Sequence, residues 1–285
     1  MLDNIKNKYL LEIIFENIRK RLKLKILKYN KNLMNKLNIN IDDFKQFKLL
    51  KEINQELNLN IEDIELLSLD LNYKNLNDDK LKTLDKIEFI NLKKLYLNNN
   101  KITSFKTFDK YSLEILDLGN NKISDISILK NDIFKELKEL YLNNNNISDI
   151  KILEKVKFEK LEELDLSNNE ISDINILEKV NFKDLKKLYL GYNNISDIKV
   201  LEKVKFEKLE ELYLGENKIS DINILEKVNF KELKKLYLCY NNISDIKVLE
   251  KVEFEKLEIL SLEENKISDK QIIPSLKLKI KDFRI

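Results

Sequence analysis

The stretch LKKLYLGYNNISDIKV, residues 185–200, returns 48 residues later as LKKLYLCYNNISDIKV, residues 233–248, with one glycine replaced by cysteine. Both copies fit the pattern L-x-x-L-x-L-x-x-N-x-I, where x is any residue. Eight copies of this pattern begin at Leu92, Leu113, Leu137, Leu161, Leu185, Leu209, Leu233 and Leu257. The last six spacings are 24 residues, the first is 21, and a ninth, degenerate copy begins near Leu66. A fixed period of this length predicts a solenoid in which each repeat packs against its neighbours.

The first half of each repeat predicts a short β-strand. In LKKLYL, leucines alternate with other residues, so Leu188 and Leu190 would point into the core and Tyr189 toward solvent. Because every repeat carries this alternation, the strands should lie side by side and parallel. We expect an α/β fold with a parallel sheet on the concave side of the solenoid.

The second half of each repeat predicts a short helix. In ISDIKVLEKVKF, Ser196 or Asp197 can cap a helix of one to two turns whose apolar side is Ile198, Leu201 and Val204. Such helices should cover the convex side of the solenoid.

One asparagine follows each strand, where the chain turns inward. These asparagines are Asn100, Asn121, Asn145, Asn169, Asn193, Asn217, Asn241 and Asn265. A buried amide at this place can bond backbone groups of neighbouring turns that would otherwise be unpaired. We therefore expect a structural asparagine ladder rather than a ligand site.

The N-x-I-S-D-I turn at residues 193–198 resembles the leucine-rich repeats of internalins and of phosphatase-1 regulatory subunits, here in 24-residue units. The resemblance covers residues 66 to about 270. It implies a leucine-rich-repeat solenoid that recognises a partner on its concave surface, and it supplies no catalytic residues. A phosphatase regulatory subunit is an alternative function.

Residues 1–60 lack the repeat, and we interpret them as a helical N-terminal cap before the solenoid of residues 61–270. An apolar stripe over residues 10–18 fits one helix, and Asp42 or Asp43 could start another. The segment LLEIIFENI, followed by ILKYNKNL, resembles an F-box, the small helical module that joins a repeat domain to a ubiquitin-ligase scaffold. This resemblance implies a scaffold subunit as a possible partner at the N-terminal segment, and a substrate adaptor as a further alternative function.

Residues 271–285 predict a C-terminal cap strand. After Pro274, the segment SLKLKIKDF alternates in polarity, which would place Lys277, Lys279 and Lys281 on the exposed side of a strand. Lysines there would discourage pairing with the edge of another chain.

The composition argues against several function classes. The 285-residue chain has no histidine, one cysteine (Cys239) and three glycines, which excludes a histidine base, a thiolate metal cluster and a glycine-rich nucleotide loop. We expect no catalytic residue, no metal and no cofactor. The net charge is only +2 and lysines are interleaved with acids, so we expect no nucleic-acid partner. A lone cysteine and the absence of a long apolar run predict a cytoplasmic protein without a membrane partner.

Paired glutamates such as Glu162 and Glu163 raise the alternative of a carboxylate hydrolase. However, the second position of the repeat alternates in sign throughout: Lys93, Glu114, Lys138, Glu162, Lys186, Glu210, Lys234 and Glu258. Adjacent strands lie about 4.8 Å apart, so each lysine would flank two glutamates. We interpret this alternation as stabilising the sheet.

The concave side carries most of the differences between neighbouring copies. Residues 145–192 and 193–240 differ at seven positions, and five of the changes are non-conservative. Four of these five fall at repeat positions five, seven and eight and the fifth lies beside them, whereas the exposed residues expected on the convex side are unchanged: Lys151, Glu154, Lys155, Lys157, Glu159 and Lys160. This pattern indicates a recognition surface. Its candidate partner-binding residues are Tyr96, Tyr141, Asp165, Tyr189, Tyr192, Tyr213, Glu216, Tyr237 and Tyr240. The sequence therefore predicts a non-enzymatic interaction module that binds a protein or peptide on its concave face.

Overall fold

The computed structural model describes residues 41–252 and 254–285, which fall into two units. The first unit contains the helix α4 (Ile41–Leu57). This helix includes the segment that the sequence predicts to be helical after Asp42 or Asp43. The apolar stripe of residues 10–18 and the F-box-like segments lie outside the described residues.

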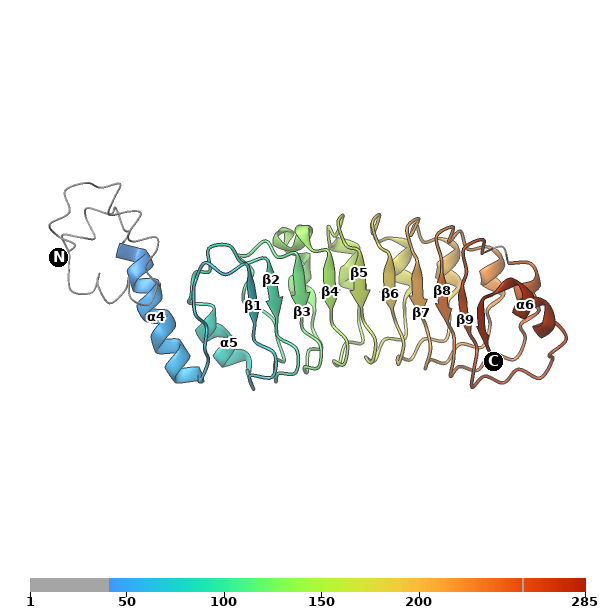
Figure 1. Ribbon diagram of the computed structural model, residues 1–285, viewed down its shortest axis with the longest axis horizontal. Helices are drawn as coiled ribbons and strands as arrows, with labels where there is room; N and C mark the ends of the chain where they lie inside the picture. Colours follow the sequence, from blue (N-terminus) through green and yellow to red (C-terminus); the bar gives the residue numbers. More distant parts are fainter. Residues whose placement is uncertain (1–40, 253) are drawn as a thin grey trace. The chain divides into compact units, whose positions relative to one another are not determined.

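The second unit is built on one parallel sheet of ten strands in chain order (Figure 1). The strands are β1 (Ser68–Asp70), β2 (Lys94–Tyr96), β3 (Ile115–Asp117), β4 (Glu139–Tyr141), β5 (Glu163–Asp165), β6 (Lys187–Tyr189), β7 (Glu211–Tyr213), β8 (Lys235–Tyr237), β9 (Ile259–Ser261) and β10 (Asp282–Arg284). Each strand pairs with the next in the same register, so equivalent repeat positions lie beside each other. The predicted α/β leucine-rich solenoid with a parallel sheet is confirmed.

Short helical segments return the chain from one strand to the next. They are α5 (Asp78–Leu84), η2 (Ser127–Lys130), η3 (Asp132–Glu136), η4 (Lys151–Lys155), η5 (Asn175–Glu178), η6 (Lys199–Glu202), η7 (Asn223–Glu226) and η8 (Lys247–Glu250). The η segments are 3₁₀ helices, a form that proteins use in short pieces. At η6, Asp197 Oδ1 accepts the Lys199 N–H at 2.9 Å, so the aspartate of the turn, rather than Ser196, stabilises the start of the helix.

The core consists of leucines from the strands and apolar residues from the return segments. Leu188, Leu190, Ile198 and Leu201 are all buried, as the alternation predicts. Buried phenylalanines of neighbouring repeats stack on one another, with ring centroids 6.1 Å apart between Phe182 and Phe206.

The predicted C-terminal strand is wrong over most of its length. A helix, α6 (Ile273–Lys279), precedes β10, which is only three residues long. Pro274 lies in the first turn of α6, where its fixed φ favours a helix and its missing N–H is not needed. Leu276 is buried and Leu278 is 89 % exposed, so burial follows a helical period rather than strand alternation. Lys277 and Lys279 consequently lie on the helix, not on an edge strand.

Candidate functional site

The solvent-facing side of the sheet is formed by the third and fifth residues of each repeat, because the central leucine of each strand from β1 to β9 is buried. We call this side the strand face. Its third-position row is Ser68, Lys94, Ile115, Glu139, Glu163, Lys187, Glu211, Lys235, Ile259 and Asp282. Its fifth-position row is Asp70, Tyr96, Asp117, Tyr141, Asp165, Tyr189, Tyr213, Tyr237, Ser261 and Arg284.

Three consecutive tyrosines of the fifth-position row form a stack. Ring centroids are 4.5 Å apart between Tyr189 and Tyr213, and 4.3 Å apart between Tyr213 and Tyr237. The planes differ by 28° and 10° respectively, so the rings lie nearly parallel. The in-register strands hold them at this spacing. We call these three residues the tyrosine stack.

Two of the three stacked tyrosines, Tyr189 and Tyr213, stay protonated at neutral pH. Burial raises the pKa of Tyr213, and its hydrogen bond to Glu211 and the glutamate's charge raise it further. The Tyr213 hydroxyl donates to Glu211 Oε2 at 2.9 Å. Burial also raises the pKa of Tyr189, together with the negative charges of Glu163 and Glu211. Tyr189 and Tyr213 therefore present neutral phenol rings to a partner.

The remaining candidates of this row do not join the stack. Tyr96 and Tyr141 are separated by Asp117, and Asp165 separates Tyr141 from Tyr189. Asp165 accepts the Ser167 N–H at 2.9 Å and the Ser167 hydroxyl at 2.6 Å. Burial nevertheless raises the pKa of Asp165, against the lowering effect of these bonds. The row thus alternates aromatic and acidic residues before β6 and is aromatic from β6 to β8.

Another row of side chains follows the strands at the eighth repeat position, where the backbone is left-handed. Tyr192, Glu216 and Tyr240 have φ of 54°, 54° and 53°. Tyr192 is 61 % exposed and Tyr240 is 51 % exposed. We call Tyr192, Glu216, Tyr240 and Glu264 the rim row. In four preceding repeats this position is asparagine, namely Asn99, Asn120, Asn144 and Asn168, also at positive φ.

Ion pairs connect successive repeats across the face and its border. At the second position, lysine Nζ atoms lie 2.6–2.9 Å from glutamates one repeat earlier: Lys138–Glu114, Lys186–Glu162 and Lys234–Glu210. The alternation in sign therefore produces real ion pairs, each with the preceding repeat. A parallel row at the third position was not predicted from the sequence: Lys187 lies 3.0 Å from Glu163, and Lys235 lies 3.0 Å from Glu211. The same alternation of sign at residues 163, 187, 211 and 235 could have revealed it.

The asparagines that follow the strands are committed to backbone hydrogen bonds. The Asn193 amide nitrogen donates to the carbonyls of Leu166, Leu190 and Gly191 at 3.0–3.1 Å. Its oxygen accepts the Ile171 N–H at 3.0 Å, so one side chain connects two repeats. The other asparagines of the series make equivalent bonds.

Known proteins can be compared with this geometry. A family model described as Leucine Rich repeats (2 copies) matches residues 90–131, 135–179 and 183–227. The chain is a leucine-rich repeat protein. No curated protein sequence matches it.

Solved structures with a similar fold come from bacteria and plants. Internalin C2 from Listeria monocytogenes is 23 % identical, with a TM-score of 0.58 over 74 % of this leucine-rich repeat protein and 92 % of that chain. The functional domain of InlJ from the same species is 21 % identical, with a TM-score of 0.54 over 78 % of this chain and 46 % of that one. A plant ice-binding protein is 22 % identical, with a TM-score of 0.53 over 72 % and 66 % of the two chains. At these identities the likeness shows the fold alone.

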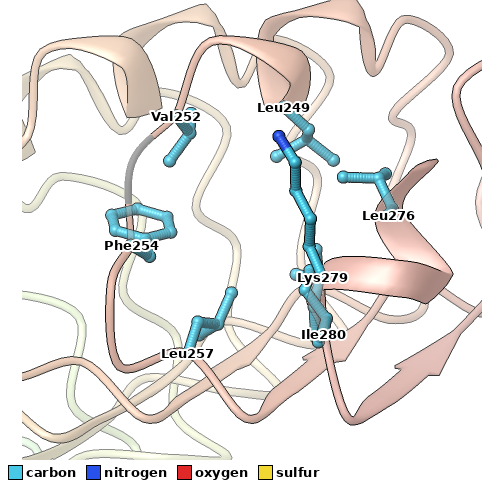
Figure 2. Close-up of a pocket in the computed structure, with 8 residues that line it drawn as sticks. Leu249, Val252, Phe254, Leu257, Leu276, Lys279 and Ile280 are labelled. Atoms are coloured by element: carbon cyan, nitrogen blue, oxygen red, sulfur yellow. The ribbon is translucent and has the colours of Figure 1, made fainter.

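A small cavity lies between the last repeat of this leucine-rich repeat protein and α6 (Figure 2). Its volume is about 60 Å³. It is lined by Leu249, Val252, Phe254, Leu257, Leu260, Leu276, Lys279 and Ile280. Lys279 is the one charged residue of this lining, so the cavity is a packing gap at the end of the solenoid rather than a polar ligand site.

Within the ranges 41–252 and 254–285, no group of three histidine, cysteine, aspartate or glutamate residues is placed to hold a metal ion. Over the same ranges, no helix combines the length and the apolar character needed to cross a membrane.

Proposed function

We propose that this leucine-rich repeat protein is a non-enzymatic interaction module that binds a protein or peptide on its strand face. The tyrosine stack and the rim row would form the centre of the binding surface. One observation carries the proposal: two exposed rings, Tyr192 and Tyr240, occupy left-handed backbone positions in the repeats that also hold stacked Tyr189 and Tyr237. The strand face is the side of the sheet that the sequence predicts to be concave.

The backbone conformation argues that these rings serve more than folding. A residue other than glycine, asparagine or aspartate in the left-handed region costs about 1 kcal/mol. Asparagine fills the equivalent position in four preceding repeats, so the fold itself does not require tyrosine there. Backbone strain of this kind is characteristic of functional sites.

The chemistry of the rings suits recognition. Tyrosine buries a large area with few rotatable bonds and keeps a hydroxyl for a hydrogen bond, which makes it frequent among residues that dominate binding energy. In the part of the chain that the structure describes, the hydroxyls of Tyr189, Tyr192 and Tyr240 make no hydrogen bond. They are free to bond a partner's backbone or side chains.

The other groups on the surface favour binding over catalysis. The paired glutamates at the start of β5 and β7 each lie within 3.0 Å of a lysine one repeat on: Glu162, Glu163, Glu210 and Glu211. The lone cysteine, Cys239, is a free thiol. A free thiol fits a reducing compartment, so we place the interaction in the cytoplasm.

The proposal can be tested by selecting peptides from a random library on the immobilised protein. Selected peptides should lose at least tenfold in affinity for the double variant Tyr192→Asn/Tyr240→Asn. Because asparagine tolerates left-handed φ, the double variant should melt at or above the wild-type temperature, which separates binding from folding.

A matched control exists within the chain. Tyr73 is the eighth residue of the degenerate repeat, is 75 % exposed and has φ of 58°, but belongs to the repeat of β1 rather than those of β6 to β8. Tyr73→Asn should leave the affinity unchanged. Equal binding of the selected peptides to wild type and double variant would overturn the proposal.

A further inference from the structure

Glu216 lies between Tyr192 and Tyr240 in the rim row. Backbone hydrogen bonds hold the three residues in register. The Tyr192 N–H donates to the Gly215 carbonyl at 3.0 Å, and the Glu216 N–H donates to the Cys239 carbonyl at 2.9 Å. Neighbouring strands are about 4.8 Å apart, so the two tyrosines lie about 10 Å from each other with the glutamate midway. The row therefore presents a ring, a carboxylate and a second ring in sequence.

The Glu216 carboxylate has no partner among the described residues, and neither does that of Glu264. Glutamates of the return segments, by contrast, lie within 4 Å of lysines one repeat on. Those pairs are Glu154–Lys179, Glu178–Lys203, Glu202–Lys227 and Glu226–Lys251. The protein thus leaves a negative charge uncompensated at the point where it also exposes two rings.

The same charge imbalance extends over the strand face. Four acids of its third- and fifth-position rows make no ion pair with any described residue: Asp70, Asp117, Glu139 and Asp165. Among the lysines of these rows, only Lys94 makes no ion pair with a described residue. The two rows hold seven acidic and four basic residues, whereas the full chain has a net charge of +2. A partner with complementary charge would be basic.

We propose that the rim row binds a lysine or arginine side chain of the partner, with the cation between the rings of Tyr192 and Tyr240 and paired with the Glu216 carboxylate. A cation midway between the two rings would be about 5 Å from each, within the roughly 6 Å over which rings attract cations. The neighbouring part of the basic peptide segment would contact the tyrosine stack. This inference rests on the proposed function and specifies the class of its partner.

The test uses the peptide library described above. Peptides selected on the wild-type protein should be enriched in lysine or arginine over aspartate and glutamate. For the tightest peptide, Glu216→Gln should weaken binding about tenfold, as should replacing the peptide's key cation by alanine. The two changes together should cost little more than either alone, because they remove the same contact.

The control variant is Glu207→Gln, which removes the same charge from an exposed glutamate between η6 and β7, away from the strand face. It should bind as wild type does. Peptides without cation enrichment whose affinity falls with Tyr192→Asn/Tyr240→Asn but not with Glu216→Gln would overturn this inference and leave the proposed function standing. Peptides insensitive to both changes, or a library without binders, would contradict both.

Discussion

The asparagine at the ninth repeat position illustrates how a single polar residue supports this fold. Asn193 is buried and connects two turns of the solenoid through four hydrogen bonds. Replacing it by alanine leaves backbone groups of both turns unpaired, so Asn193→Ala should lower the free energy of unfolding by roughly 1 to 3 kcal/mol. Urea denaturation measures this change. The adjacent Asn194 makes no side-chain hydrogen bond with the described residues, and equal losses from Asn193→Ala and Asn194→Ala would refute the structural role.

The partly buried carboxyl of Asp165 makes the stability of the fold depend on pH. Because burial raises its pKa, the folded state binds the proton more tightly than the unfolded state does. Stability therefore falls as pH rises through the interval between the unfolded pKa and the raised folded pKa, and the loss persists at neutral pH. Asp165→Asn should raise the melting temperature at pH 7, and the gain should fade as pH falls through the raised folded pKa and be lost below 3.8, the ordinary pKa of this carboxyl.

Asp184 is the control with the opposite sign. Its hydrogen bond from Lys208, at 2.6 Å, lowers its pKa, so ionisation stabilises the folded state above the unfolded pKa. Asp184→Asn should lower the melting temperature at pH 7 and have little effect in acid. A lower melting temperature for Asp165→Asn at neutral pH would contradict the effect of burial.

At the scale of elements, the tyrosine stack joins β6, β7 and β8 through their side chains. Tyr213 lies between two rings, and each ring pair contributes about 0.5 to 1.5 kcal/mol beyond the area it buries. Tyr213→Ala should therefore lower the free energy of unfolding by about 1 to 3 kcal/mol more than Tyr141→Ala does. Tyr141 is a matched control, because its hydroxyl also donates to the glutamate two residues earlier but its strand neighbours are aspartates. Equal destabilisation in urea would show that the ring contacts contribute nothing.

The expected destabilisation limits what Tyr213→Ala can show about binding. A loss of affinity in Tyr213→Ala would combine a missing contact with a weakened sheet. The exposed rim residues Tyr192 and Tyr240 separate the two effects, since replacing them removes no stacked ring.

The strands were predictable from sequence because burial of every second residue leaves a direct pattern in LKKLYL and its copies. The register followed too, since identical repeats can only align in one way. The C-terminal helix α6 was not predicted, because SLKLKIKDF alternates over a few residues and the helical spacing of Ile272, Leu276 and Ile280 is equally present. Only packing against the last repeat distinguishes the two patterns.

The candidate site was predictable in its residue types but not in its grouping. The fifth repeat position predicted Tyr96 and Tyr141 as part of the same site as the stacked tyrosines. Aspartates on the intervening strands separate these two residues from each other and from the stack. The left-handed backbone of Tyr192, Glu216 and Tyr240 could have been predicted only from the asparagines at the same position in earlier repeats. Asparagine is among the non-glycine residues that most often adopt this conformation. The asparagines of the earlier repeats therefore indicate a left-handed position in the sequence itself.

At the scale of the whole molecule, the charge pattern has a period of two repeats. Lysine and acid alternate at the second position, and at the third position from Glu163 to Lys235. They also alternate at the last position, in Lys160–Glu136, Lys208–Asp184 and Lys256–Glu232. This explains why the most similar stretches of sequence are 48 residues apart rather than 24. Copying a unit of two repeats keeps lysines beside acids at these positions, whereas copying a single repeat would place like charges beside each other.

Deletion variants can test this period. Removing residues 185–208 would place Glu162, Glu163 and Asp184 beside Glu210, Glu211 and Glu232, whereas removing residues 185–232 would place them beside Lys234, Lys235 and Lys256. Added salt screens exposed charges. The melting temperature of the 24-residue deletion should therefore rise with NaCl relative to that of the 48-residue deletion. Parallel salt dependence in both variants would show that these charges do not set the period.

The tyrosine stack also has an optical consequence. The chain contains eleven tyrosines and no tryptophan, so its near-ultraviolet absorption and emission come from phenol rings without a stronger chromophore to mask them. Rings 4.3 and 4.5 Å apart are close enough for their electronic transitions to couple and for excitation to pass between them. The circular dichroism of this region should be dominated by Tyr189, Tyr213 and Tyr237, whose mutual orientation is fixed. Any ligand that tilts or covers these rings would change that signal, and binding to the strand face could be followed without attaching a label.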